Sequence, residues 1–195
     1  EQRRQRQQHD REDEPVAGSC LCHHGEEVLG RLDTTRLEGF ADALQSAQLD
    51  LADPLPRQPE QLADLVADVR AYPDFVPWIT SMRVWNAREE GEGVGLQDAE
   101  ASVGFSFLKE RFSTWVRHDR NAPKVEVGLL RGPFKHLKNR WEFFPHPDGT
   151  RLEFMIDFAF KSRMLDMMLS ANFDRAVEKL IGCFEAEAQR RYGGR

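Results

Sequence analysis

TRLEFMIDFAFK, residues 150–161, is the stretch of the sequence that decides the fold. Apolar side chains recur there at every second position, which is the period of a β-strand with one buried face. The side chains between them are mostly charged and point to the opposite side. The stretch therefore predicts a strand with one face in water and one inward face, formed by Leu152, Phe154, Ile156, Phe158 and Phe160.

The preceding fifty residues show the same alternation in several shorter runs. Turn signals at residues 90–95 (EGEGVG), 120–123 (RNAP), 131–134 (RGPF) and 146–149 (HPDG) separate these runs. We expect about six strands joined in sequence as a strongly curved antiparallel meander. The predicted inward residues are Ala99, Ala101, Val103, Phe105, Phe107, Val125, Val127, Leu129, Leu137, Trp141 and Phe143.

A proline-free stretch of nearly thirty residues follows Ser162, a residue that can serve as a helix N-cap. Its apolar side chains share one broad face, from Leu165 to Phe184, so we expect one long C-terminal helix that packs against the sheet. Helices, a meander and this closing helix predict an α+β domain in which the curved sheet wraps around the helix.

Shorter elements precede the strands. The segment 26–51 has an approximate helical spacing, and residues 58–69 place Leu62, Leu65 and Val66 on one helical face after three prolines. In residues 71–79 (AYPDFVPWI), two prolines interrupt any long helix and leave a compact aromatic turn.

The N-terminal residues are predicted to be disordered. Residues 1–18 carry many charges and glutamines and almost nothing apolar. The sequence CLCHH at residues 20–24 has metal-binding residue types but lacks a second separated pair of ligands, so an exposed tail is the preferred interpretation and a metal site the alternative. We divide the chain into an extension, residues 1–50, and a domain, residues 51–192.

Composition excludes several classes of protein. The formal charge of −6 supplies no general attraction to DNA, and no apolar run is long enough to span a membrane. Three cysteines are too few for a disulfide framework, which favours a reducing compartment such as the cytoplasm. Membrane contact, if present, is expected to be peripheral.

Four segments together resemble the coenzyme Q-binding protein family of the START-like superfamily, which also contains ribosome association toxins and polyketide cyclase/dehydrase proteins. They are residues 71–79, 101–116, 129–143 and 152–169 within a similarity over residues 57–192. The resemblance implies a helix-grip fold that binds ubiquinone as a non-enzymatic carrier in support of respiration. One departure is the stretch 47–57 (AQLDLADPLPR), where the family has a strand but this sequence has two prolines and poor alternation.

An apolar cavity between sheet and helix would bind the ligand on this hypothesis, whereas a filled core is the rival interpretation of the same pattern. Two turns rich in apolar groups, around Trp78 and Phe134, are predicted to form its mouth and a membrane-facing rim. The candidate ligand-binding residues are Phe75, Pro77, Trp78, Phe105, Phe107, Phe134, Trp141, Phe143, Phe158, Phe160, Met164, Met168 and Phe173.

An enzyme would need an acid, base or nucleophile inside the cavity, and the predicted inward positions are almost entirely apolar. His118, His136 and His146 are expected at turns or on outward positions. We therefore predict no catalytic residue, no catalytic cofactor and no metal. The alternative functions are a cyclase/dehydrase-like enzyme and binding to the large ribosomal subunit, the latter through a basic cluster formed by Arg131, Lys135, Lys138 and Arg140.

Overall fold

The computed structural model describes residues 45–50, 58–105, 108–170 and 173–193 of the chain. Predictions for residues 1–44, including the CLCHH sequence and most of the helix expected in 26–51, lie outside this range. The elements are, in chain order, β1 (Gln45–Asp50), α1 (Pro59–Ala67), η1 (Val69–Ala71), α2 (Tyr72–Phe75), β2 (Ile79–Gly91), β3 (Val94–Phe105), β4 (Leu108–Asp119), β5 (Lys124–Arg131), β6 (Phe134–His146), β7 (Gly149–Phe160), α3 (Arg163–Ser170) and α4 (Phe173–Tyr192).

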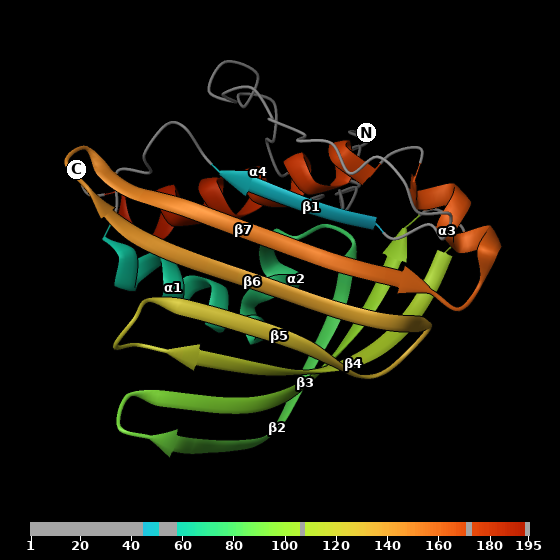
Figure 1. The fold of residues 1–195 in the computed structure, drawn as a ribbon, viewed down its shortest axis with the longest axis horizontal. Coiled ribbons are helices and arrows are strands. Elements are labelled where there is room, and N and C mark those ends of the chain that lie inside the picture. Colours follow the sequence, from blue (N-terminus) through green and yellow to red (C-terminus); the bar gives the residue numbers. More distant parts are fainter. Residues whose placement is uncertain (1–44, 51–57, 106–107, 171–172, 194–195) are drawn as a thin grey trace, which may run out of the picture.

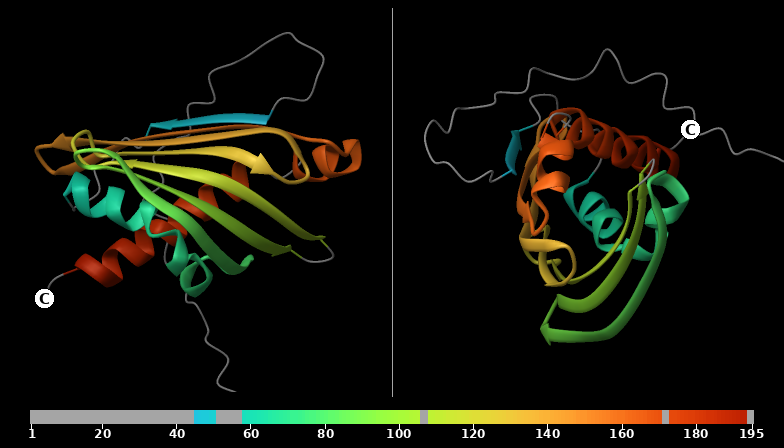
Figure 2. Two further views of the ribbon diagram at one scale, coloured as in Figure 1. Left: turned by 90° about the horizontal axis from the view of Figure 1, so that it is seen from below. Right: turned by 90° about the vertical axis from the view of Figure 1, so that its right-hand side faces the viewer.

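The strands form one seven-stranded antiparallel sheet in the order β1-β7-β6-β5-β4-β3-β2. The sheet is strongly curved, and α1, α2 and α4 lie on its concave side (Figures 1 and 2). This arrangement confirms the predicted α+β class and the curved meander around a C-terminal helix. None of the described helices combines the length and the hydrophobicity needed to cross a bilayer.

The first strand corrects the expected start of the domain. Residues 45–50 form β1, which pairs antiparallel with β7, so they belong to the sheet and not to a disordered extension or to a helix. An edge strand requires only one partner, and β1 ends at Asp50, before the prolines at positions 54 and 56. Local alternation was too weak a signal for a strand this short.

The two ends of the sheet are closed differently. The end that carries the β2–β3, β4–β5 and β6–β7 turns is covered by α1, and we call it the α1 end. The opposite end carries the start of β2, the β5–β6 turn and the junction of β7 with α3, and we call it the α3 end. Figure 2 shows that α4 crosses the concave side between them.

The predicted single C-terminal helix is two helices. Ser162 starts α3 as expected: its hydroxyl accepts a hydrogen bond from the Leu165 amide at 3.5 Å. The Asp166 carboxylate then accepts a 2.8 Å bond from the Phe160 amide, and the Lys161 amide donates to the Pro133 carbonyl at 2.7 Å. These bonds hold α3 beside the end of β7, whereas α4 runs across the sheet in another direction (Figure 2). Helical periodicity continues through both helices, so it did not reveal the change of direction.

Candidate functional site

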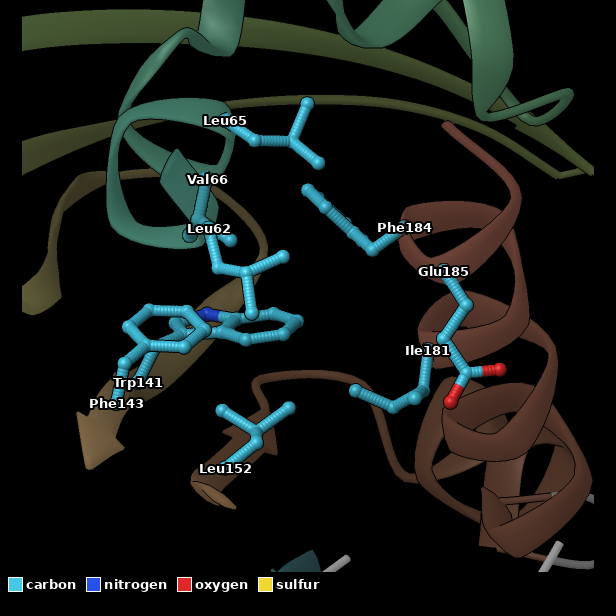
Figure 3. A pocket seen from close by; sticks show the side chains of 9 residues that line it. All are labelled: Leu62, Leu65, Val66, Trp141, Phe143, Leu152, Ile181, Phe184 and Glu185. Carbon is cyan, nitrogen blue, oxygen red and sulfur yellow. The ribbon is translucent and has the colours of Figure 1, made fainter. Parts of the chain in front are cut away.

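The inner face of the sheet is a filled core at the α1 end. The Trp141 ring lies 4.5 Å from that of Phe154 and 5.0 Å from that of Phe184, measured between centroids. The space left among these groups is a cavity of about 20 Å³. Figure 3 shows the side chains that point into it, from α1, β6, β7 and α4: Leu62, Leu65, Val66, Trp141, Phe143, Leu152, Ile181, Phe184 and Glu185. Such a cavity holds about one water molecule, whereas sites for drug-sized ligands have volumes of roughly 300–1,000 Å³.

A second aromatic cluster occupies the α3 end. The Phe134 ring stacks on that of Phe160 at 4.6 Å and meets the edges of Phe112 and Phe158 at 5.2 and 5.8 Å. The first residue of α4, Phe173, contacts Phe158 at 5.5 Å and so joins the helix to the sheet here. Half-buried apolar side chains, among them Phe112, Leu129 and Leu165, border this cluster.

Between the two clusters lies a central patch of inward residues on three adjacent strands. Val127 pairs with Asn139, and Asn139 pairs with Ile156, so their side chains form a row across β5, β6 and β7. All three are half-buried, as is Leu129 beside them. An inward residue in the middle of a wrapped sheet is fully covered when the interior is filled, so this exposure marks the part of the inner face that remains accessible.

Apart from Met164, the candidate ligand residues predicted from the sequence fall into four groups. Trp141, Phe143 and Phe75 belong to the filled core of the α1 end, whereas Phe134, Phe158, Phe160 and Phe173 form the cluster at the α3 end. Pro77 is exposed, and Trp78 is half-buried with the Lys179 ammonium 5.9 Å from its ring centroid. The side chains of Phe105 and Met168, and Phe107 as a whole, lie outside the described part of the chain.

Two of these assignments require correction. Met164 was expected inside, but its side chain is 63% exposed, and Figure 2 shows that its helix, α3, lies beyond the end of the sheet. Phe134 was expected on an exposed rim, but it is only 8% exposed because three phenylalanine rings enclose it. The exposed large apolar side chains among the described residues are instead Leu130, Met164 and Met167.

Sequence analysis missed Asn139. Its Oδ1 is buried and has no hydrogen-bond partner among the described residues. The signal was present in the alternation itself, because a polar side chain stands at an inward position between Leu137 and Trp141. Asparagine is depleted in strands, so its presence in this apolar row needs a reason.

His118 was expected at the surface and is in fact only 7% exposed, because α1 covers the end of β4 that carries it. It borders an open polar groove of about 470 Å³ formed with α1, β2 and β3. Burial lowers the pKa of His118, opposed by Asp64, whose carboxylate lies 3.7 Å away. Acidic and basic side chains are mixed in this groove, and Arg120 approaches both Asp64 and Glu89 at 4.0 and 3.9 Å.

The described residues contain no group of three histidine, cysteine or acidic side chains that could hold a metal ion. The predicted basic cluster is divided by the fold. Arg131 and Lys135 lie at the α3 end, whereas Lys138 and Arg140 project from β6 on the outer face. There Arg140 pairs with Glu142 at 3.1 Å, and Lys138 stands opposite Asp157 in the sheet. Acidic neighbours thus offset the positive charge of Lys138 and Arg140, which are half of the predicted cluster.

Comparison with known proteins gives the family. The model of the family described as polyketide cyclase/dehydrase and lipid transport matches residues 55–185. The chain belongs to this family. A ribosome association toxin RatA of Rickettsia prowazekii is 33% identical over 138 residues, which cover 69% of this chain and 91% of that protein. The mitochondrial coenzyme Q-binding protein COQ10 homolog B of Xenopus laevis is 34% identical over 142 residues, or 69% of this chain and 54% of the relative.

Solved structures agree with this family and with a START-like fold. An 18 kDa protein of Caulobacter crescentus has a TM-score of 0.63 at 56% identity, over 77% of this chain and 99% of its own. A START superfamily protein of Mycobacterium smegmatis has a TM-score of 0.58 at 20% identity, over 75% of this chain and 97% of its own, which shows the fold alone. The similarity to coenzyme Q-binding and ribosome association toxin proteins inferred from the four sequence segments is thereby confirmed.

Proposed function

We propose that the protein is a non-enzymatic carrier that binds ubiquinone, or a similar isoprenoid lipid, on the inner face of its sheet and so supports respiratory electron transport. The observation that carries the proposal is the half-buried central patch, which adjoins an aromatic cluster at the α3 end. A ring bound there would cover the patch, and an isoprenoid tail would continue along the phenylalanine rings toward α3. Each Å² of apolar surface that the ligand covers would contribute about 25 cal/mol to the free energy of binding. The cost of ordering the ligand is subtracted from the total.

A carrier role suits the chemistry of this region better than catalysis does. The central patch contains Val127, Leu129 and Ile156 with one neutral amide, Asn139, and none of these titrates in the physiological range. The described titratable group on the inner face, His118, lies at the α1 end beneath α1. Glu185 of α4 points into the small cavity at the same end, and the described inward strand residues that adjoin the central patch carry no titratable group.

The decisive experiment is to purify the protein from a quinone-producing host, extract it with organic solvent and identify co-purifying lipids by mass spectrometry. We expect ubiquinone in near-stoichiometric amount. A matched variant, Ile156→Trp, fills the central patch with a larger side chain and should lose the ligand while remaining folded. A ligand-free extract that persists after incubation with ubiquinone would overturn the proposal.

On this proposal the carrier works in the cytoplasm and touches the inner membrane peripherally, because so apolar a ligand must be collected from a bilayer. The surface that fits this contact is the α3 end. Met164 and Met167 are 63% and 72% exposed on α3, and Leu130 is 51% exposed at the end of β5. Exposed cations surround them: Lys109, Arg111, Arg131, Lys135, Lys161 and Arg163. Apolar side chains ringed by cations fit a bilayer that contains anionic lipids.

Glu100 lies 3.8 Å from Arg111 and offsets its charge, whereas two other acidic side chains near these cations are less exposed than the cations themselves. Glu110 is half-buried, and Asp166 is buried with its carboxylate bonded to the Phe160 amide. We expect the double variant Met164→Ser/Met167→Ser to lose most of its co-sedimentation with vesicles of phosphatidylcholine and phosphatidylglycerol. Met155→Ser, on the outward side of β7, is the matched control and should behave as the wild type. Unchanged sedimentation of the double variant would contradict this docking surface.

Binding to the large ribosomal subunit is the second candidate, favoured by the similarity to RatA and by the exposed Arg131 and Lys135. Replacing both with glutamine should abolish co-sedimentation with ribosomal subunits at low salt if this function holds. The matched pair Lys138→Gln/Arg140→Gln, on the outer face, tests whether the whole predicted cluster takes part. Wild-type protein that does not sediment with subunits at low salt would exclude this candidate.

A further inference from the structure

Asn139 is a polar side chain in the middle of an apolar surface. It projects inward from β6, with Leu137 and Trp141 as the nearest inward residues of its own strand. Its neighbours across the sheet are Val127 on β5 and Ile156 on β7. No charged side chain stands at any of these four neighbouring positions.

The amide oxygen of Asn139 is buried and unpartnered among the described residues. Buried polar atoms in folded proteins nearly always have a hydrogen-bond partner. Without one, the atom loses its hydrogen bonds to water on folding and gains nothing in return. A leucine at this position would continue the apolar row without that penalty. The asparagine is therefore costly for folding unless a water molecule or a ligand that reaches the central patch pairs with its oxygen.

We propose that Asn139 is the polar anchor for the ring of the bound ligand, and that the ligand class is an isoprenoid whose ring bears oxygen atoms that exchange hydrogen bonds with a neutral amide. This inference rests on the proposed carrier function and deepens it. The side-chain amide both donates and accepts, so it bonds a quinone carbonyl through its NH₂ group and a quinol hydroxyl through its oxygen. One residue thus accommodates both oxidation states without a charge.

The surroundings fix the orientation of the ligand. Asn139 lies at the boundary between the filled core and the aromatic cluster that contains Phe158 and Phe173. A ring held at Asn139 cannot extend toward the α1 end, where the cavity measures only about 20 Å³. Its tail must therefore run toward the α3 end, where Met164 and Met167 are exposed. The ring enters first and the tail follows.

The test compares two probes by isothermal titration calorimetry on the wild type and on Asn139→Leu. Ubiquinone with a single isoprene unit has the ring oxygens, and prenylbenzene keeps a ring and the same tail but has no oxygen. The reduced form of the ubiquinone probe, the quinol, has hydroxyl groups that donate to Oδ1, so we expect Asn139→Leu to bind the quinol about tenfold more weakly, which corresponds to the loss of one hydrogen bond. Its affinity for prenylbenzene should be equal to or higher than that of the wild type.

Each other outcome is informative. Unchanged quinol affinity in Asn139→Leu overturns the anchor while the carrier proposal stands. An equal loss for both probes also overturns it, because the substitution would then have damaged the apolar surface. Wild-type protein that binds neither probe refutes the carrier proposal itself. The prenylbenzene affinity shows that the variant is folded, and thermal unfolding of the ligand-free variant should occur at the wild-type temperature or above.

Discussion

The two ends of the inner face are built from similar residues and differ in how completely they are covered. At the α1 end, α1 and α4 close over Trp141, Phe154 and Leu152, each at most 3% exposed. At the α3 end Phe134, Phe158 and Phe160 are 4–8% exposed, and the adjoining helix α3 exposes two methionines. One end therefore supplies stability and the other is available for a ligand.

The largest expected effect is on stability at the α1 end. Phe154 is completely buried, and its ring contacts Trp141 at 4.5 Å. Replacing it with alanine removes the ring and leaves a cavity that the packed neighbours cannot fill. We expect Phe154→Ala to lower the free energy of unfolding by about 3–5 kcal/mol, measured by urea denaturation.

Ile156→Ala is the matched control, because Ile156 lies two residues further on the same strand and the same face. Its side chain is only half-buried, so we expect a loss of roughly 1–2 kcal/mol. The same variant should weaken ubiquinone binding. If the two substitutions destabilised the protein equally, the central patch would be as tightly packed as the core, and the proposed division would be wrong.

The sequence revealed the meander and the inward residues of β5, β6 and β7 because a half-buried antiparallel sheet has a clear period of two, but it placed His118 of β4 outward. It did not reveal β1, whose pairing with β7 depends on residues a hundred positions away. It also placed Met164 inside, since the helical period does not show where a helix changes direction. The alternation shows that Asn139 is the polar exception among the inward residues of β6. It does not show that Oδ1 of Asn139 lacks a hydrogen-bond partner among the described residues.

A second and smaller effect concerns the ion pairs that hold α4 against α1. Glu187 is 5% exposed and accepts hydrogen bonds from Arg190 at 2.6 and 2.7 Å and from Arg191 at 2.6 Å. Arg191 also donates to Asp68 at 2.9 Å, just beyond α1. We expect Glu187→Gln to cost about 1–3 kcal/mol of unfolding free energy at pH 7, because two guanidinium groups lose their charged partner.

The direction of the pKa shift of Glu187 determines how its contribution to stability depends on pH. Hydrogen bonds, first from Arg190 and then from Arg191, hold the pKa of Glu187 below its ordinary value of about 4.5. Its stabilisation is therefore complete above that value and disappears as pH falls through the lowered pKa. The difference between wild type and Glu187→Gln should shrink in the same range. A difference that stays constant down to pH 3 would show that packing, not charge, is responsible.

The smallest predicted effect is the titration of His118, also at the α1 end. Burial lowers its pKa below the ordinary value of about 6.5; Asp64 and Asp119 oppose this change, and Arg120 reinforces it. The unfolded chain then binds a proton more readily than the folded one, so His118 makes stability fall as pH decreases below about 6.5 toward the lowered pKa. In His118→Gln this part of the pH dependence should be absent.

Asp64→Asn gives the opposite change and serves as the directional control. Without that carboxylate 3.7 Å from the imidazole, the pKa of His118 should fall further, and the loss of stability on acidification should become larger. Because the titration belongs to the α1 end, saturating ubiquinone should raise the unfolding temperature at every pH without changing its slope between pH 7 and 5. A slope that changes when ubiquinone binds would mean that the ligand reaches the environment of His118, and the two ends of the inner face would then be coupled.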